Sequence, residues 1–415
     1  MSVMGFMSPA SSSPPGPTTA IAAPDIVAPD VAAPAVIAAG RPAIRAFAAE
    51  DLPAVAGLFK TTFRSGDAVP LAAILAYFRR LFLDGPEYDP ASPSLVHVTA
   101  AGEVSGFIGS LAQPMSVKGR TIRAAHACAL MVADPKQDSF AGARLMRSFV
   151  GGPQELSFTE TSSPLSRKLW TKLGGTAVAA YSMKWLRLLR PAGTAVALSA
   201  KRWRMLRALH PLAGGLDRTV GRRLGGDYLA LPPEPAGFTT TIVDRAAIVP
   251  VVGDLMRRFA LAPAWPEAQL AGRLAHAAHM PAFGELVCGV VTDRRGAPAG
   301  AFLYHTGRNE LAHVLQVLAR DAAAAEIVVG SLIRDAHARG AVALTGRIDP
   351  SLLEALLYAN CIILHRGATL VHSRDAEVLD AVARGDAILT GLAGESWSEL
   401  IGGLTAAPHR GPAAA

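Results

Sequence analysis

The sequence predicts an α/β protein built from two similar halves. In the first half, segments typical of strands and helices follow one another in the order β-α-α-β-β-β-α-β-α-β. The second half, from about residue 237, repeats this order in outline. Placing "HVLQVLARDAAAAEIVVGSLI" under "HACALMVADPKQDSFAGARLM" aligns a strand and the helix that follows it in both halves. A repeated unit of this size indicates a tandem duplication.

Composition is typical of a globular protein. Of the 415 residues, 51% are hydrophobic and 18% are charged, with a net charge of +7, and this length is enough for two or more domains. No apolar run reaches the roughly 20 residues that cross a bilayer, and the N-terminus lacks a basic leader, so we expect a cytoplasmic protein. Cys128, Cys288 and Cys361 lie in apolar stretches without metal-ligand spacing. They are expected to be buried thiols, with no metal site.

The elements of the first half follow from apolar spacing and turn residues. A strand at 43–46 precedes a helix in which Leu52, Val55, Leu58 and Phe59 share one face, with Pro53 in its first turn. A second helix covers "PLAAILAYFRRLFLDG". Three strands come next, "SLVHVTA", "EVSGFIGSLAQPMSV" and "IRAAHACALMVA", and glycine-containing turns at 100–102 and 118–119 join them as hairpins.

The stretch "VADPKQDSFAGARLM" leads from the third of these strands through a turn into a helix that begins near Ser139. Backbone N–H groups at such a helix start are free to bind an anion. A strand "ELSFTE", a helix "SPLSRKLWTKLGG" and a final strand "TAVAAYSMKWLRL" complete a first module over 41–188. The second module, 237–403, ends in a strand pair closing with "GATLVHS". Residues 1–40 and 404–415 are predicted to be disordered tails.

Residues 189–236 form a basic linker, predicted to be mostly helical. Arginine, lysine and leucine dominate it, as in "KRWRMLRALHPLAGGLDRTVGRRLGG". Three interpretations stand: a connecting helix packed on both modules with solvated arginines, a weak contact of 201–223 with anionic membrane, or a nucleic-acid contact. No recognition motif accompanies the charge, so we expect no nucleic-acid partner.

Two motifs carry a resemblance to a known family. Gln137, Phe140 and Gly142 fall on the pattern Gln/Arg-x-x-Gly-x-Gly/Ala, and Ser163, Ser166, Trp170 and Gly174 fall on Asn-x-x-Ala/Ser-x-x-x-Tyr-x-x-x-Gly. With the element order, these make residues 42–187 resemble the GNAT superfamily of acyltransferases. The whole chain resembles a tandem two-module bacterial member with a degenerate second module. The resemblance implies an α/β (α+β) fold in which each module has a mixed, mostly antiparallel central sheet flanked by helices.

The resemblance also implies a function. Family members move an acyl group from coenzyme A to an amine by direct attack of the amine on the thioester. For this chain, the resemblance implies an acetyl group. The acceptor would be a small molecule. The positions implied to bind acetyl-CoA are Met131, Val132, Gln137, Ser139, Phe140, Ala141, Gly142 and Ser163. Backbone N–H groups near Met131 and Val132 would bind the thioester oxygen. Phe140 replaces a glycine and Asp138 adds a negative charge, and both are expected to weaken binding.

Candidates for catalysis are fewer. The family tyrosine returns a proton to the thiolate, but the indole of Trp170 cannot, so we expect Trp170 to be a packing residue. His126 and Cys128 point to one face of the central strand, and the resemblance implies that His126 relays the proton of the amine. A half-buried histidine filling the sheet is the alternative. Glu160 is the second candidate base, or else an exposed strand-end carboxylate.

The second module departs further from the family. Its turn "ARDAAAAEIV" has no glycine and adds Asp321, so we expect no tight binding of coenzyme A there. Tyr358 falls on the family tyrosine position and is expected to be a core residue, and His305 and His313 are expected to pack. The alternative functions are a non-catalytic binding or assembly protein with this fold, and a membrane-peripheral protein of envelope or polysaccharide assembly. The oligomeric state is left open.

Overall fold

Two β-sheets flanked by helices make up the protein. The computed structural model describes residues 42–66, 69–136, 138–200, 212–217, 229–365, 367–401 and 404. In both sheets most neighbouring strands are antiparallel, which confirms the predicted fold class. The predicted tails, except Leu404, and residues 201–211 and 218–228 of the linker lie outside the described residues. The membrane contact predicted for 201–223 therefore falls almost wholly outside them.

The first sheet has eight strands. Along the sheet the order is β1 (Ala43–Ala46), β2 (Leu95–Val98), β3 (Val104–Val117), β4 (Arg120–Val132), β5 (Leu156–Thr159), β15 (Leu370–Ser373) and β6 (Thr176–Ala177), and β9 (Leu261–Pro263) pairs with β3. Among the described strands of this sheet, β4 and β5 are paired in parallel and the other neighbours are antiparallel. Gly102 and Gly119, with φ of 87° and 84°, form the predicted hairpin turns on either side of β3, a conformation that glycine adopts without strain.

The second sheet has seven strands. Its order is β14 (Ile362–His365), β7 (Met183–Leu188), β13 (Ala343–Arg347), β12 (Leu311–Ala319), β11 (Pro298–Thr306), β10 (Glu285–Asp293) and β8 (Phe238–Val243). Only β12 and β13 are parallel. In the first half β3-β4-α3-β5-α4, and in the second β11-β12-α10-β13-α11, follow the same order along the chain.

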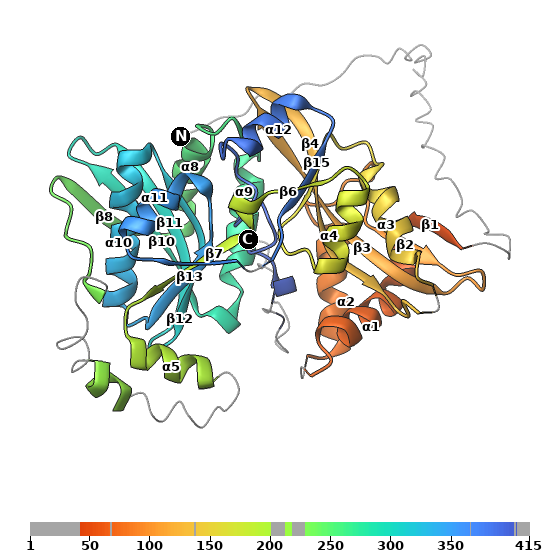
Figure 1. The fold of residues 1–415 in the computed structure, drawn as a ribbon, viewed down its shortest axis with the longest axis horizontal. Helices are drawn as coiled ribbons and strands as arrows, with labels where there is room; N and C mark the ends of the chain where they lie inside the picture. The colour runs from red at the N-terminus through yellow and green to blue at the C-terminus, as the bar shows by residue number, and fades with distance from the viewer. Residues whose placement is uncertain are drawn as a thin grey trace, which may run out of the picture. The chain divides into compact units, whose positions relative to one another are not determined.

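The two halves exchange strands. β7, predicted as the last strand of the first module, lies between β13 and β14 of the second sheet. In return β15, from near the end of the second half, lies between β5 and β6 of the first sheet. Figure 1 shows the blue β15 beside strands of the first sheet and the yellow-green β7 beside β13. β14 and β15, expected as a pair, therefore belong to different sheets, and the predicted boundary at residue 188 does not separate the sheets.

Helices cover both faces of each sheet. They are α1 (Leu52–Phe63), α2 (Leu71–Arg79), α3 (Ala141–Val150), α4 (Pro164–Lys172), α5 (Pro191–Ala200), α8 (Arg245–Met256), α9 (Glu267–Ala278), α10 (Ala322–Ala338), α11 (Leu353–Tyr358) and α12 (Ala376–Ala383). Short turns of 3-10 helix lie at Ala49–Asp51, Ala179–Ser182, Pro281–Phe283, Pro350–Leu352 and Glu399–Ile401, and Arg80–Asp84 is a π-helical turn. α1 begins as predicted, with Pro53 in its first turn. In the described part of the chain, none of these helices has the length and apolar character of a membrane span.

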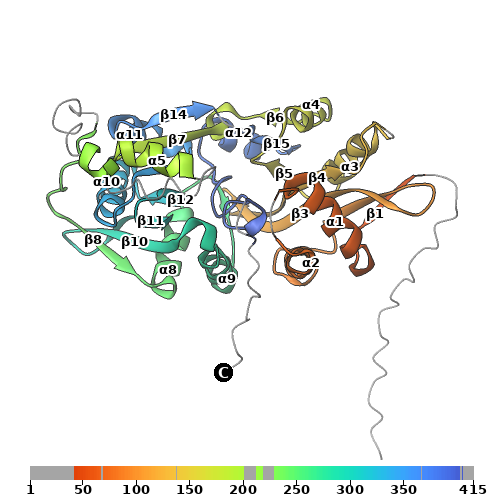
Figure 2. The ribbon, with the colours of Figure 1, turned by 90° about the horizontal axis from the view of Figure 1, so that it is seen from below.

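One hydrophobic core is common to both sheets. It joins α1 and α2 to α8 and α9, and it includes Phe107 and Met131 of the first sheet as well as Leu303 and Leu315 of the second. Leu392 and Trp397, from the segment after α12, are buried in the same core. Separate cores lie under α3 and α4 and under α10 and α11. Figure 2 shows α3 and α4 on one face of the first sheet, with α1 and α2 on the other.

Candidate functional site

A cavity opens where the parallel strands β4 and β5 diverge. The two strands pair only over 124–126 and 156–158. Beyond these pairs the strand ends separate, and a cavity of about 390 Å³ lies between them, bounded by the start of α3 and by α4. Its wall includes hydroxyl and backbone groups of Cys128, Ala129, Met131, Val132, Ser139, Gly142, Ala143, Thr159, Thr161, Ser162, Ser163 and Ser166. Most of the predicted binding positions therefore meet at one cavity.

A β-bulge lies in the wall of this cavity. Cys128 pairs with Gly109 and Met131 with Phe107, so two residues of β4 face the single residue Ile108 of β3. Ala129 has φ of 48°, a left-handed conformation that costs a non-glycine residue free energy and is often found at functional sites. A bulge interrupts the ladder, and the bulged residues of β4 are among those that line the cavity.

The turn before α3 forms the anion-binding end of the cavity. Phe140 is the N-cap of α3 and is 67% exposed, so its ring does not fill the cavity. The Asp138 carboxylate accepts the Phe140 N–H at 3.1 Å, which removes one donor from the turn. Gly142 and Ala143 line the cavity in the first turn of α3, where N–H groups have no intrahelical acceptor. Gln137 lies outside the described residues.

The negative charge of Asp138 is balanced locally. Arg144, one turn into α3, donates a hydrogen bond to the Asp138 carboxylate, and the same guanidinium lies 2.9 Å from Nε2 of His97. The predicted repulsion of a phosphate by Asp138 is therefore reduced by a cation in direct contact with it. Ala141 is fully buried, so it can contribute only its backbone.

α4 supplies the other side of the cavity. Ser163 caps this helix by accepting the Ser166 N–H at 3.2 Å. The indole of Trp170 is 1% exposed and meets the Phe149 ring edge-on at 6.3 Å. This burial agrees with the prediction that Trp170 is a packing residue, although the residue also lines the cavity. An indole at the position of the family's phenol offers no acid for proton transfer.

His126 does not have the properties of the base predicted for it. Its side chain is fully buried against the edge of the Phe158 ring, at 5.0 Å, and it does not line the cavity. Burial, with the nearby charges of Arg273 and Arg347, lowers the pKa of His126 to about 3. In the part of the chain that the structure describes, neither ring nitrogen has a hydrogen-bond partner. A neutral imidazole with this pKa cannot hold the proton of an amine at neutral pH, and the alternative of a histidine filling the sheet fits better.

Glu160, the second candidate base, is fully buried rather than exposed at the strand end. Ser396 donates to its Oε1 at 2.8 Å, and Nε of Arg347 lies 3.9 Å from the same atom. Burial raises the pKa of the Glu160 carboxyl. The side chain does not line the cavity. Glu160 points instead toward the segment that follows α12.

A carboxyl that the sequence did not indicate lies next to it. Glu395, in the segment between α12 and the last 3-10 turn, is 5% exposed and accepts a hydrogen bond from the Thr161 hydroxyl. Burial and the charge of Glu160 raise the pKa of Glu395 to about 7. Because Thr161 lines the cavity, Glu395 is one side chain away from it. No local pattern around residue 395 indicates this position, since it depends on packing between segments far apart in sequence.

Comparisons with known proteins identify the fold. No protein-family model matches the chain, and no curated protein matches it. Among solved structures, a GCN5-related N-acetyltransferase from Anabaena variabilis ATCC 29413 is similar over 82% of this chain and 75% of its own, with 12% identity and a TM-score of 0.54. A probable N-acyltransferase from Enterococcus faecalis V583, a conserved protein of unknown function, is similar over 80% and 73%, with 9% identity and a TM-score of 0.52.

The chain has the fold of the GCN5-related N-acetyltransferases. The family predicted from the motifs is thus confirmed at the level of the fold, and identities this low extend no further than the fold. The cavity between β4 and β5 holds five of the eight predicted binding positions, Met131, Val132, Ser139, Gly142 and Ser163.

In the second half, the corresponding place is filled by the chain itself. β12 has a bulge at Leu315 opposite β11. The Leu392 N–H donates to Oε1 of the neighbouring Gln316 at 3.2 Å, so the segment after α12 lies against the bulge. At the start of α10, the Asp321 carboxylate accepts the Ala324 N–H at 2.8 Å. These contacts give a physical reason why the second half would not bind coenzyme A.

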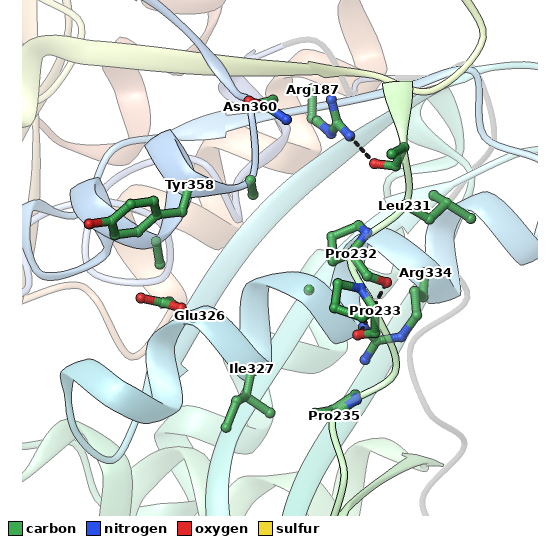
Figure 3. A pocket seen from close by; sticks show the side chains of 14 residues that line it. Arg187, Leu231, Pro232, Pro233, Pro235, Glu326, Ile327, Arg334, Tyr358 and Asn360 are labelled. Carbon is green, nitrogen blue, oxygen red and sulfur yellow. Dashed lines mark hydrogen bonds between the residues drawn. The ribbon is translucent and has the colours of Figure 1, made fainter. Parts of the chain in front are cut away.

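A separate cavity of about 370 Å³ lies between α10 and α11. Figure 3 shows Arg187 and Arg334 reaching the 230–235 segment, where Arg187 donates to Ala230 O at 2.7 Å and Arg334 to Pro233 O at 2.6 Å. Both guanidinium groups therefore bind backbone oxygens and hold the 230–235 segment in place. Tyr358 lines this cavity and is 67% exposed, so the prediction that it is a core residue is wrong.

The remaining predicted packing residues are in place. His305 is buried, with its Nε2 2.8 Å from Ala277 O, and His313 packs against Phe283 with ring centroids 4.5 Å apart. The three cysteines are free and buried, as predicted. Within the described ranges, no cluster of three or more histidine, cysteine, aspartate or glutamate side chains is arranged to hold a metal ion.

Proposed function

We propose that this protein is an acyl-CoA-dependent N-acyltransferase that transfers an acyl group, with acetyl as the first to test, to the amine of a small molecule. The observation that supports this most is the cavity between the diverging strands β4 and β5, with a bulge in one wall and the start of α3 at one end. A second observation is the GCN5-related fold. The cytoplasmic location expected from the sequence remains part of the proposal.

The residues of the cavity fit a pantetheine thioester. The hydroxyl groups of Ser139, Ser163 and Ser166 and the first turn of α3 offer donors for phosphate. The apolar wall formed by Leu130, Met146 and Leu169 suits the arm between phosphate and thioester. When bound, the thioester supplies an activated acyl group. Backbone N–H groups at Met131 and Val132 would then hold the carbonyl oxygen as negative charge develops on it.

One substitution in the cavity tests this proposal. Gly142→Asp places a carboxylate at the phosphate end, and Ser148→Asp places the same charge on an exposed turn of α3 outside the cavity. Calorimetry should show acetyl-CoA binding to the wild type and to Ser148→Asp. Gly142→Asp should bind at least about tenfold more weakly, since like charges about 4 Å apart near a protein surface repel by about 4 kcal/mol and a tenfold change needs only about 1.4 kcal/mol. Binding of acetyl-CoA that is equally weak or absent in all three proteins would contradict the proposal.

A non-catalytic binding protein is the alternative that a specific observation favours. Trp170 provides no acid, and Asp138 occupies one N–H of the turn. Release of coenzyme A thiol from acetyl-CoA in the presence of a primary amine such as benzylamine separates the two functions. Thiol release with formation of the acetylated amine supports the transferase, whereas binding of acetyl-CoA without turnover over a broad panel of amines supports the alternative.

A further inference from the structure

The described part of the cavity wall has no side chain suited to take the proton of an amine. Among the described residues that line it, the titratable side chains are Asp138 and Cys128. Asp138 is hydrogen-bonded to Arg144 at the phosphate end. Burial, with the charge of Glu395, raises the pKa of the Cys128 thiol well above its ordinary value. Acyl transfer to an amine nevertheless needs a proton acceptor, and a carboxyl behind the wall can serve as one only through a residue of the wall.

Two carboxyl groups lie directly behind that wall. Glu160 precedes Thr161 in the chain, and the Glu395 carboxylate accepts a hydrogen bond from the Thr161 hydroxyl. The Glu160 side chain reaches the residue before Glu395, since a Cβ atom built on Gly394 would overlap Oε2 of Glu160. Ser396, on the other side of Glu395, donates to Oε1 of Glu160. Thr161 is therefore the link between the cavity and a pair of carboxyls that are both at most 5% exposed.

The charges around the two carboxyls only partly offset the effect of burial, which raises the pKa of both. The charged and titratable groups that face Glu395 come from four strands: Glu160 of the β5 end, Arg347 of β13, Lys184 of β7 and Cys128 of β4. Arg347 uses Nη2 to bind the backbone oxygen of Glu160 and the Thr369 hydroxyl. Within the described residues, Oε2 of Glu160 has no hydrogen-bond partner. Burial raises the pKa of both carboxyls, and the charge of Glu160 raises that of Glu395 further, so the pair holds a proton more readily than exposed carboxyls do.

We propose that Glu160 and Glu395 share one proton, and that Glu395 accepts the proton of the acceptor amine through the Thr161 hydroxyl. This rests on the proposed acyl transfer. The amine nitrogen forms a bond to the thioester carbonyl carbon, and the bond from that carbon to sulfur breaks. The nitrogen gives one proton to Oγ1 of Thr161 while Thr161 passes its own to Glu395. The reverse transfer delivers this proton to the leaving thiolate, which departs as the thiol.

This arrangement has two consequences. The carboxyl pair returns the proton to sulfur, so the reaction needs no phenol at the position of Trp170. The relay also takes up a single proton, so an acceptor that arrives as an ammonium ion must first release one proton to solvent. The neutral amine then attacks and gives its next proton to Thr161. Thr161 is the residue that contacts the substrate, and Glu395 and Glu160 act through it.

The test is the pH dependence of turnover with acetyl-CoA and benzylamine. Glu395→Gln should lower kcat by about 100-fold or more, the usual range for loss of a general base, and should remove the rise of kcat near pH 7. Its KM for acetyl-CoA should stay unchanged. Thr161→Val should show the same loss and Thr161→Ser should restore turnover. Glu267→Gln, an exposed glutamate of α9, is the matched control and should behave as wild type.

A second measurement separates this proposal from the function on which it rests. Infrared titration of the carboxyl bands of the full chain, without substrate, should show a group that titrates near pH 7 and disappears in Glu395→Gln. If acetyl-CoA binds and turns over but Glu395→Gln or Thr161→Val keeps the wild-type pH profile, the relay is wrong. If acetyl-CoA neither binds nor reacts, the proposed function and the relay both fail, and the infrared band reports the shared proton alone.

Discussion

Gly391 is the residue at which the chain approaches the bulge of the second sheet most closely, and Gly391→Ala tests that contact. Gly391 has φ of 66°. A Cβ atom built on it would lie closer than 3.0 Å to both Oε1 of Gln316 and the backbone oxygen of Leu315. The left-handed conformation costs an alanine about 1–2 kcal/mol, and overlap with atoms that cannot move away costs about 1–3 kcal/mol more. We expect Gly391→Ala to lower the free energy of unfolding by about 2–5 kcal/mol.

Gly102→Ala is the matched control. Gly102 also has a positive φ, 87°, but a Cβ there meets no atom within 4 Å. Its substitution carries the cost of the backbone conformation without the overlap. Urea unfolding of both variants and the wild type, at the same temperature and with equal m-values, gives the difference. A larger loss for Gly391→Ala, by about 1–3 kcal/mol, supports the reasoning, and equal losses in the two variants refute it.

Two further predictions concern buried titratable groups. Burial raises the pKa of Glu395 from 4.5 to about 7, so the folded protein binds more protons than the unfolded chain between these pH values. Its free energy of unfolding should therefore fall as pH rises from about 4.5 to 7, by at most about 3 kcal/mol. Urea unfolding at pH 5 and pH 8 should show a smaller loss in Glu395→Gln than in the wild type. His126→Leu should leave the pH profile of turnover unchanged and should not lower the unfolding free energy by more than about 1 kcal/mol, because the buried ring that it removes has no hydrogen-bond partner among the described residues. A displaced profile would restore His126 as a base.

Local patterns in the sequence were enough to predict the elements near the site. The apolar spacing of Leu52 to Phe59 and the position of Pro53 indicate α1, and the glycines at 102 and 119 indicate the hairpins of β3. The strand-to-helix turn at 132–146 was identified by the same kind of signal. Each of these features depends on residues within one or two turns of each other, which is the range over which sequence patterns carry information.

The parts that sequence reasoning missed depend on contacts between distant segments. "MKWLRL" and "LVHS" both read as strands, but an alternating or apolar pattern does not say which sheet a strand joins. His126 was placed on the correct strand, yet its burial comes from Phe158 and from charges of the other half. The sequence around Glu395 contains no signal that distinguishes it from a surface carboxylate. Its burial depends on the packing of its segment against the end of β5.

The exchange of β7 and β15 affects how the protein is made. Phe158 pairs with Val371, so the first sheet cannot close until nearly the whole polypeptide has left the ribosome. Until then the open edge of β5 is accessible to other chains, which is a risk for unpaired strands. Truncated products that stop before β15 would keep this edge, and we expect them to aggregate rather than to accumulate as an independent half.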